Sequence, residues 1–376
     1  MKILILSCNT GAGHNSVATA VKENFERHDC ECEIFDALSF ISGGFSAIIS
    51  FGHSFLYQYF PELIGNGLKN AGEDENTLAE GRPERLILDA GVPGLLHKIR
   101  SDHYDMIICS HMFATIMLSD VVKRGKYDGP TARIETDYMI DPGSAYTYLD
   151  ACFLPSTELK REWDEQAIKG LGVASGLPVR SRFYERHDKA RAKEVLGIAP
   201  NSRHLVIMGG SMGAGPLPEV ISYLAQKLPD DTDLSIVCGN NKLLHRHLLD
   251  SLPESEHIHL HGFCDFMPLL LDSAELYMTK PGGISITEAA VKKVPMVLID
   301  AVGGCEEPNM HYFVDSGYAI SGKDPEKIAS DSIELLADDM QRREMSYALE
   351  KLAEINRPDI IYETMMQLYE SKTKTV

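Results

Sequence analysis

Basic residues are scarce in this sequence. Lysine and arginine together number 36 against 55 aspartates and glutamates, so the formal net charge is −19. Since nucleic acids are bound through contacts between phosphates and cationic side chains, this deficit argues against a general nucleic-acid-binding protein. An anionic membrane would also repel the chain as a whole.

Metal-binding patterns are missing as well. The eight cysteines are scattered beside apolar runs, and Cys30 and Cys32 are spaced too closely for the usual pair of zinc ligands. No group of aspartates is spaced to hold a cation. The first residues read directly as a strand, without the basic and apolar regions of a signal peptide. We therefore expect reduced thiols, no metal and no cofactor in a cytoplasmic protein.

Apolar runs alternate with helical patterns along the whole sequence, which is typical of α/β proteins with parallel sheets. A length of 376 residues predicts two domains. We expect one Rossmann-like domain over residues 1–178, a second over 179–356, and a C-terminal helix over 357–376 that packs back on the first. The pattern also predicts one helix over 83–100 and a strand over 132–137.

Three glycine-containing loops follow predicted strands, the position where α/β folds bind phosphates. They are residues 9–15, 209–215 and 279–283. Glycines let a ligand approach the backbone, and the free N–H groups at a helix start favour an anion. The first loop lacks a third glycine at Asn15 or Ser16, which argues against a nicotinamide cofactor.

The loop at 279–283 and the helix pattern after it are the most informative part of the sequence. Gly282 and Gly283 are placed to meet a diphosphate, and Glu288 lies about one turn inside the helix, where a carboxylate can hold the hydroxyl groups of a ribose. A plain glycine turn followed by a surface glutamate fits the same pattern. This motif alone therefore leaves the function open.

A stretch without charged side chains runs from Ala37 to Pro61 and is rich in aromatic residues. Its glycines and His53 make it a poor transmembrane helix. One interpretation is an amphipathic surface that enters one leaflet or accepts a lipid; the other is a pair of buried helices under a loop. In the first interpretation the acceptor or membrane contacts are Phe51, Phe55, Tyr57 and Phe60.

Five short motifs occur in a fixed order. They are Gly-Ala-Gly-His at 11–14, Gly-Gly-Ser-Met-Gly-Ala at 209–214, Gly-Phe at 262–263, Thr-Lys-Pro-Gly-Gly at 279–283 with Glu288, and Glu-Glu-Pro-Asn at 306–309. In this combination the sequence resembles the monogalactosyldiacylglycerol synthase and processive diacylglycerol glucosyltransferase family, relatives of the peptidoglycan enzyme that transfers N-acetylglucosamine to a lipid-linked acceptor. The resemblance covers nearly the whole chain. It implies a GT-B fold, with two Rossmann-like domains whose parallel sheets face an interdomain cleft.

The resemblance also implies an inverting, metal-independent transfer from a UDP-sugar, with the lipid acceptor on the first domain. Together with the uncharged aromatic segment, these motifs lead us to expect transfer of a hexose to diacylglycerol by a peripheral enzyme at the cytoplasmic face of the membrane. A transferase with a polyprenyl-linked or soluble acceptor, a sugar-nucleotide epimerase and a non-catalytic UDP-sugar sensor are the alternatives. Cys305 replaces a glutamine of the family, which leaves the donor sugar open. The donor-binding residues that the resemblance implies are Arg180, Gly210, Ser211, Phe263, Gly282, Gly283, Glu288, Glu306 and Asn309.

Inversion requires a group that takes the proton of the attacking hydroxyl. The loop histidine of the family matches His14, and an imidazole suits this role because its ordinary pKa is near neutrality. Asp137, at the end of the predicted strand, is the rival base, and the two could act together. A structural histidine at a helix start is the alternative for His14. His111, at another strand end, could contact acceptor or phosphate.

Overall fold

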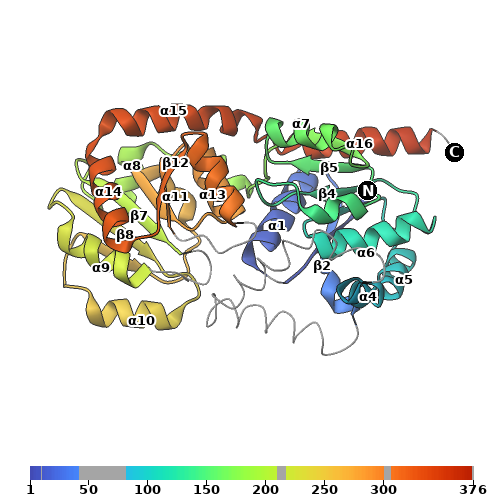
Figure 1. Cartoon of the computed structure of the whole chain (residues 1–376), viewed down its shortest axis with the longest axis horizontal. Helices are drawn as coiled ribbons and strands as arrows, with labels where there is room; N and C mark the ends of the chain where they lie inside the picture. Colours follow the sequence, from blue (N-terminus) through green and yellow to red (C-terminus); the bar gives the residue numbers. More distant parts are fainter. Residues whose placement is uncertain (10, 42–81, 210–216, 300–305, 375–376) are drawn as a thin grey trace. The chain divides into compact units, whose positions relative to one another are not determined.

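The structure is a computed structural model that describes residues 1–9, 11–41, 82–209, 217–299 and 306–374 (Figure 1). The chain forms two compact units. The N-terminal unit consists of Met1–Ser181 together with Ile355–Val376, and the C-terminal unit is Arg182–Glu354. The chain therefore passes from the first unit into the second after Ser181 and returns after Glu354.

The N-terminal unit is built on a parallel sheet of six strands in the order β2-β1-β3-β4-β5-β6. The central strands are apolar on both faces, as expected for a parallel sheet covered by helices on both sides; Leu4 and Ile5 on adjacent positions are both 0% exposed. The strands are β1 (Lys2–Ser7), β2 (Glu31–Asp36), β3 (Met106–Cys109), β4 (Thr131–Ile134), β5 (Ala151–Leu154) and β6 (Leu171–Ala174).

Helices pack on both faces of this sheet. Three of the helices share one buried apolar cluster with the sheet, to which they contribute Leu88, Leu95 and Met117. The C-terminal helix packs against the first helix, where the Tyr362 ring lies 5.4 Å from the Phe25 ring. The helical segments are α1 (Ala12–Glu26), η1 (Ala37–Phe40), α4 (Pro83–Asp89), α5 (Val92–Asp102), α6 (Met112–Lys123), η2 (Pro142–Tyr146), α7 (Thr157–Glu165) and α16 (Asp359–Thr373).

Two predicted elements differ in the structure. The single helix expected over 83–100 is divided into α4 and α5, because Pro93 in the first turn of α5 has no N–H to donate to the carbonyl of Asp89. The strand expected over 132–137 ends at Ile134. Beyond it the chain bends, and the Glu135 carboxylate accepts a hydrogen bond from the Asp141 backbone N–H at 3.3 Å.

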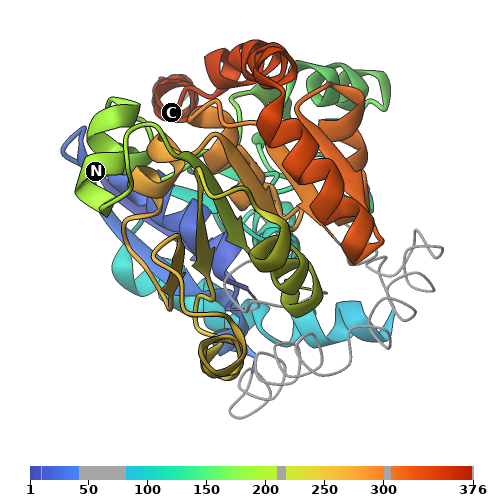
Figure 2. The ribbon, with the colours of Figure 1, turned by 90° about the vertical axis from the view of Figure 1, so that its left-hand side faces the viewer.

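The C-terminal unit contains a second parallel sheet of six strands, in the order β12-β11-β10-β7-β8-β9. Figure 2 shows helices on both of its faces. Its strands are β7 (Arg203–Met208), β8 (Thr232–Val237), β9 (Ile258–His261), β10 (Leu276–Thr279), β11 (Met296–Ile299) and β12 (Ala319–Gly322). The helical segments from its start onward are η3 (Ser181–Phe183), α8 (Lys189–Leu196), α9 (Leu217–Lys227), α10 (Lys242–Ser251), α11 (Met267–Ser273), α12 (Gly283–Val291), α13 (Glu306–Asp315), α14 (Pro325–Ala337) and α15 (Asp339–Ile355).

In both sheets the strand order reverses beside the first strand. In the N-terminal unit the chain runs from β1 outward to β2 and then crosses to β3, on the other side of β1. In the C-terminal unit it runs outward from β7 to β9 and then crosses to β10, on the other side of β7. Doubly wound sheets bind ligands outside the carboxyl ends of the strands at such a reversal. In each unit this topology favours a ligand site beside the first strand, at the carboxyl edge of the sheet.

The two chain segments that connect the units are hydrogen-bonded to each other within the N-terminal unit. The side-chain amide of Asn356 donates to the Leu177 carbonyl at 2.5 Å, and the Arg357 N–H donates to the Ser175 carbonyl at 3.1 Å. Gly176 lies between the two acceptors with a φ of +71°, in the left-handed region that favours glycine.

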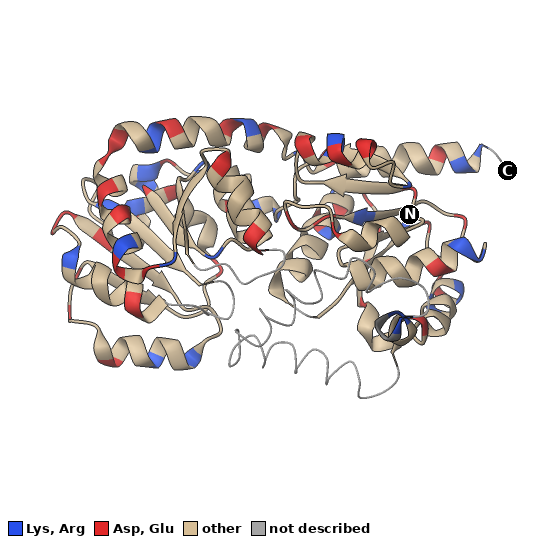
Figure 3. Cartoon of the chain, viewed as in Figure 1, with Lys and Arg blue, Asp and Glu red and all other residues tan. Residues whose placement is uncertain are grey.

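Acidic and basic residues alternate along outer helices such as α15 (Figure 3). Among the helices that the structure describes, none has both the length and the apolar composition needed to cross a bilayer.

Candidate active site

His14 lies at the strand reversal of the N-terminal unit, in the first turn of α1, and is partly exposed. Its Nδ1 is 2.9 Å from the carbonyl oxygen of Ser110, the residue directly after β3. A carbonyl oxygen only accepts, so Nδ1 carries the proton of the neutral imidazole. Nε2 is therefore left with its lone pair, the state that a general base requires.

The electrostatic surroundings of His14 suit a base. Burial lowers its pKa below the ordinary value of 6.5, while the charges of Asp137 and Asp141 and the bond to Ser110 act in the opposite direction. The imidazole is thus neutral at neutral pH. Two carboxylates lie close enough to stabilise the imidazolium that would form on proton uptake.

The structure brings the two predicted catalytic residues together. Asp137 is half-buried in the loop after β4, and its carboxylate accepts a hydrogen bond from the Thr136 hydroxyl at 3.2 Å. Its charge acts on the imidazole of His14. This arrangement favours His14 as the group that takes the proton and Asp137 as its electrostatic partner, rather than two independent bases.

His111 is the second histidine at this place. It precedes α6, where its Nδ1 accepts the backbone N–H of Phe113 at 3.0 Å. The His111 ring lies edge-on to the His14 ring, with 4.4 Å between the centroids and 62° between the planes. Because its Nδ1 is an acceptor, the proton of neutral His111 is on Nε2.

The loop between β1 and α1 is held by a separate hydrogen bond: the side chain of Asn15 accepts from the Ser7 hydroxyl at 2.7 Å.

A buried ion pair joins Arg133, in β4, to Glu135, the residue directly after the strand. Arg133 and Glu135, 3% and 5% exposed, pair with each other, and Arg133 also donates to the Ser144 hydroxyl at 2.9 Å. Sequence reasoning missed this pair and Asp141. The signal was present for the pair, because charged residues two apart on a strand point to the same face.

The second place of interest is the strand reversal of the C-terminal unit. Here β10 ends at Thr279, and the turn 280–282 leads into α12. Gly282 is the N-cap of α12, no side chain caps the helix there, and a Cβ at Gly282 would meet nothing within 4 Å. The backbone N–H groups of Gly283 and the next residues are thus held at a helix start that an anionic group can approach.

Buried side chains support this turn through hydrogen bonds. The Asn309 side chain on α13 is 0% exposed and donates to the Pro281 carbonyl at 2.9 Å. The hydroxyl of Ser285 meets those of Tyr277 at 2.8 Å and Thr279 at 3.1 Å. Asn309, predicted from the family to bind the donor, therefore supports the glycine turn in this structure.

The other predicted donor residues differ in exposure. Glu288 is 8% exposed, on the second turn of α12, whereas Phe263 is 70% exposed, just after β9. Glu306 is half-buried at the start of α13. Arg180 lies in the N-terminal unit, at the end of the segment that leads out of it, and is half-buried.

Several predicted residues lie outside the described part of the chain. They are the donor residues Gly210 and Ser211, the acceptor or membrane residues Phe51, Phe55, Tyr57 and Phe60, and the substituted position Cys305. Among the residues that the structure describes, no three histidine, cysteine, aspartate or glutamate side chains are grouped to hold a metal ion.

Two family models match this chain. Residues 14–179 match the model of monogalactosyldiacylglycerol (MGDG) synthase, and residues 202–352 match that of glycosyl transferases group 1. A processive diacylglycerol beta-glucosyltransferase of Bacillus licheniformis is 26% identical over 388 aligned residues, covering 100% of this chain and 97% of that protein. For the enzyme of the same name from Bacillus subtilis the identity is 25%, over 99% of this chain and 96% of that protein.

Solved structures share the architecture. MurG of Acinetobacter baumannii has a TM-score of 0.61 at 13% identity, over 97% of this chain and 99% of that one. The calicheamicin glycosyltransferase CalG4 has a TM-score of 0.65 at 13% identity, over 98% of both chains. At these identities the likeness concerns the fold, and with the two parallel sheets it confirms the expected α/β GT-B fold. The matches to the two family models and to full-length relatives bear out the resemblance as well: the chain is a glycosyltransferase, and it is similar to the monogalactosyldiacylglycerol synthases and, along its whole length, to the processive diacylglycerol beta-glucosyltransferases.

Proposed function

We propose that the protein transfers a hexose from a UDP-sugar to diacylglycerol with inversion, without a metal or other cofactor, as a peripheral enzyme at the cytoplasmic face of the membrane. The observation that carries this proposal is the match to processive diacylglycerol beta-glucosyltransferases over the full length of the chain. The first unit would supply the base and the acceptor site, and the second the donor site.

The state of His14 supports direct displacement. The acceptor oxygen attacks the anomeric carbon, the bond from that carbon to the diphosphate oxygen breaks, and UDP leaves with the electron pair of that bond. The hydroxyl proton passes to Nε2 of His14, which has its lone pair because Nδ1 donates to the Ser110 carbonyl. Asp137 and Asp141 then stabilise the imidazolium.

The turn before α12 supports the donor half of the proposal. Departure of UDP leaves negative charge on a diphosphate, and N–H groups at a helix start stabilise such charge without a cation. The open space at Gly282 suits a phosphate oxygen close to the backbone. Glu288, one turn further along the helix, is assigned to the ribose hydroxyls, as the family resemblance implies.

The stereochemistry provides a direct check. The hexose of UDP-glucose is α-linked, so a single displacement yields a β-glycoside, in agreement with the name beta-glucosyltransferase of the relatives. The membrane contact is proposed from the sequence alone, at Phe51, Phe55, Tyr57 and Phe60. Replacing these four aromatic residues with serine should weaken binding to vesicles in a flotation assay.

The proposal is tested by incubating the purified protein with UDP-glucose or UDP-galactose and vesicles that contain diacylglycerol. UDP release and a glycolipid with a β-linkage are expected, and chelation with EDTA should leave the rate unchanged. Both donors are needed because Cys305 stands where the family has glutamine. Vesicles without diacylglycerol, and vesicles with a polyprenyl phosphate instead, identify the acceptor.

Two variants separate the chemistry from the fold. His14→Ala should reduce transfer about 10²- to 10⁴-fold, the usual contribution of a general base, while UDP binding persists. His97→Ala, at an exposed histidine on α5, is the matched control and should transfer at the original rate. Turnover of the donor without any acceptor would favour an epimerase, and tight UDP-sugar binding without turnover would favour a sensor; either result would contradict the proposal.

A further inference from the structure

The C-terminal unit contains a cavity of about 460 Å³ that the proposed reaction does not use. Its walls come from the segments directly before β10 and β11, the C-terminal end of α12, the segment leading into α8, and α15. It therefore lies at the amino ends of the strands, the opposite edge of the sheet from the turn at Gly282. Its volume is in the range of small-molecule sites, about 300–1,000 Å³.

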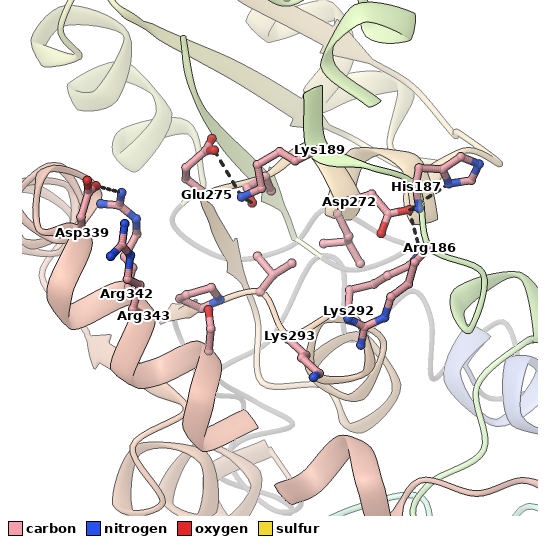
Figure 4. Close-up of a pocket in the computed structure, with 15 residues that line it drawn as sticks. Arg186, His187, Lys189, Asp272, Glu275, Lys292, Lys293, Asp339, Arg342 and Arg343 are labelled. Atoms are coloured by element: carbon pink, nitrogen blue, oxygen red, sulfur yellow. Dashed lines mark hydrogen bonds and ion pairs between the residues drawn. The ribbon is translucent and has the colours of Figure 1, made fainter. Parts of the chain in front are cut away.

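The lining is rich in cations. Six lysine or arginine side chains and three carboxylates line the cavity, although the whole chain has a net charge of −19. Figure 4 shows these side chains coming from opposite walls, with Arg342 and Arg343 on α15 and Arg186 and Lys189 on the segment that leads into and begins α8. A local excess of positive charge in an acidic protein attracts anions.

The carboxylates of the lining are already engaged. The Lys292 side chain, 0% exposed, pairs with Asp272 at 2.8 Å, and His187 approaches the same carboxylate oxygen at 3.0 Å. Lys189 pairs with Glu275 at 3.2 Å. The third carboxylate, Asp339, pairs with Arg342. The three lining carboxylates are thus engaged by Lys292, Lys189 and Arg342, and in the described part of the chain none of them pairs with Arg186 or Arg343.

Two arginines keep donors for a ligand. Arg186 donates through one nitrogen to the Val291 carbonyl at 3.0 Å, which leaves most of its N–H groups for other partners. Arg343 is exposed and, within the described part of the chain, has no carboxylate at ion-pair distance. Positive charges also lie close to one another in the lining. Burial lowers the pKa of Lys292, and the nearby charge of Arg186 lowers it further.

We propose that this cavity binds a small anion with two or more negative charges carried by phosphate groups. Guanidinium groups match phosphate oxygens with two parallel hydrogen bonds, and lysines add charge without a fixed geometry. Arg186 and Arg343 are the principal contacts. The site is separate from the glycine turn of the proposed donor site, so the anion is not the transferred sugar's diphosphate.

The test is isothermal titration calorimetry of the full chain with inorganic pyrophosphate, with citrate as a carboxylate of similar charge. Arg343→Gln should weaken pyrophosphate binding about tenfold, because it removes charge-assisted hydrogen bonds at an exposed position that the fold does not need. Arg186→Gln with Arg343→Gln should weaken it further. Arg161→Gln, on α7 of the other unit with a side chain 75% exposed, removes the same charge elsewhere and should have no effect.

Three results would overturn the inference. They are no pyrophosphate binding by the unaltered protein, binding that both arginine variants leave unchanged, and binding of citrate as tight as that of pyrophosphate. Binding at the glycine turn would give the second result, because neither arginine lies there. The outcome is therefore independent of whether the protein transfers sugar, and thermal unfolding of each variant checks that it is folded.

Discussion

Replacing Gly176 with alanine tests how the connection between the two units is held. Gly176 has a φ of +71°, and an added Cβ would lie 2.5 Å from the Cα of Asn356. The backbone of the returning segment cannot move away freely, because Asn356 donates to the Leu177 carbonyl and Arg357 to the Ser175 carbonyl. Reaching ordinary contact requires the two segments to separate by about 1 Å.

The cost follows from these contacts. The left-handed backbone conformation costs alanine about 1–2 kcal/mol, and overpacking against a backbone adds about 1–3 kcal/mol. Alanine also lowers the conformational entropy of the unfolded chain, which offsets about 0.4–1 kcal/mol of this cost. Gly176→Ala should therefore lower the free energy of unfolding of the N-terminal unit by about 3 kcal/mol. With a slope of about 2 kcal/mol per molar, the urea midpoint falls by about 1.5 M.

The assay follows the N-terminal unit by itself. The chain has a single tryptophan, Trp163, which is 2% exposed on α7 in that unit, so its fluorescence during urea unfolding reports this unit. The matched control is Gly125→Ala in the same unit. Gly125 also has a positive φ, +61°, but a Cβ there would meet nothing within 4 Å. The control should lose only about 0.5 M; equal midpoints for the two variants would refute the role of the close approach to Asn356.

Three further predictions concern the candidate active site. Because the pKa of His14 is lowered, its base form persists below pH 6.5, and transfer should decline only as the pH falls further. Asp137→Asn removes a negative charge that raises the pKa of His14, so it should move the acidic limb of the kcat/KM profile to still lower pH. Asn309→Leu leaves the Pro281 carbonyl without its buried donor and should cost about 1–3 kcal/mol in unfolding, followed by circular dichroism, with a higher KM for the UDP-sugar. Glu288→Gln should raise the KM for a UDP-sugar more than for its 2′-deoxyribose analogue, and an equal effect on both donors would argue against a ribose contact.

Residue patterns predicted the architecture because they act locally. Apolar strands followed by glycine loops indicate parallel sheets, and the carboxyl ends of such strands meet at one edge, which is enough to place His14 and Gly282 at strand reversals. The hydrogen bond from His14 to the Ser110 carbonyl joins residues 96 apart and involves a backbone atom, so no pattern of side chains in the sequence predicts it.

The contacts of Asn309 and the cationic cavity could not be predicted from the sequence either. The family motif points to Asn309 as a ligand contact, but its burial and its bond to Pro281 depend on how α13 packs behind the turn. The cationic cavity is assembled from several segments, each of which reads in the sequence as an ordinary charged surface. In such cases the packing of distant segments, rather than local propensity, determines the role of a residue.

The return of the chain to its first unit makes the C-terminal unit an insertion. All six strands of the second sheet lie between Arg182 and Glu354, whereas a chain that ended at Glu354 would lose α16 and uncover the face of α1 that Tyr362 protects. Residues 182–354 are therefore the natural segment to exchange between relatives. Such a chimera would replace the glycine turn and the cationic cavity together and retain His14 with its carboxylates, so that the two halves of the enzyme could be varied independently.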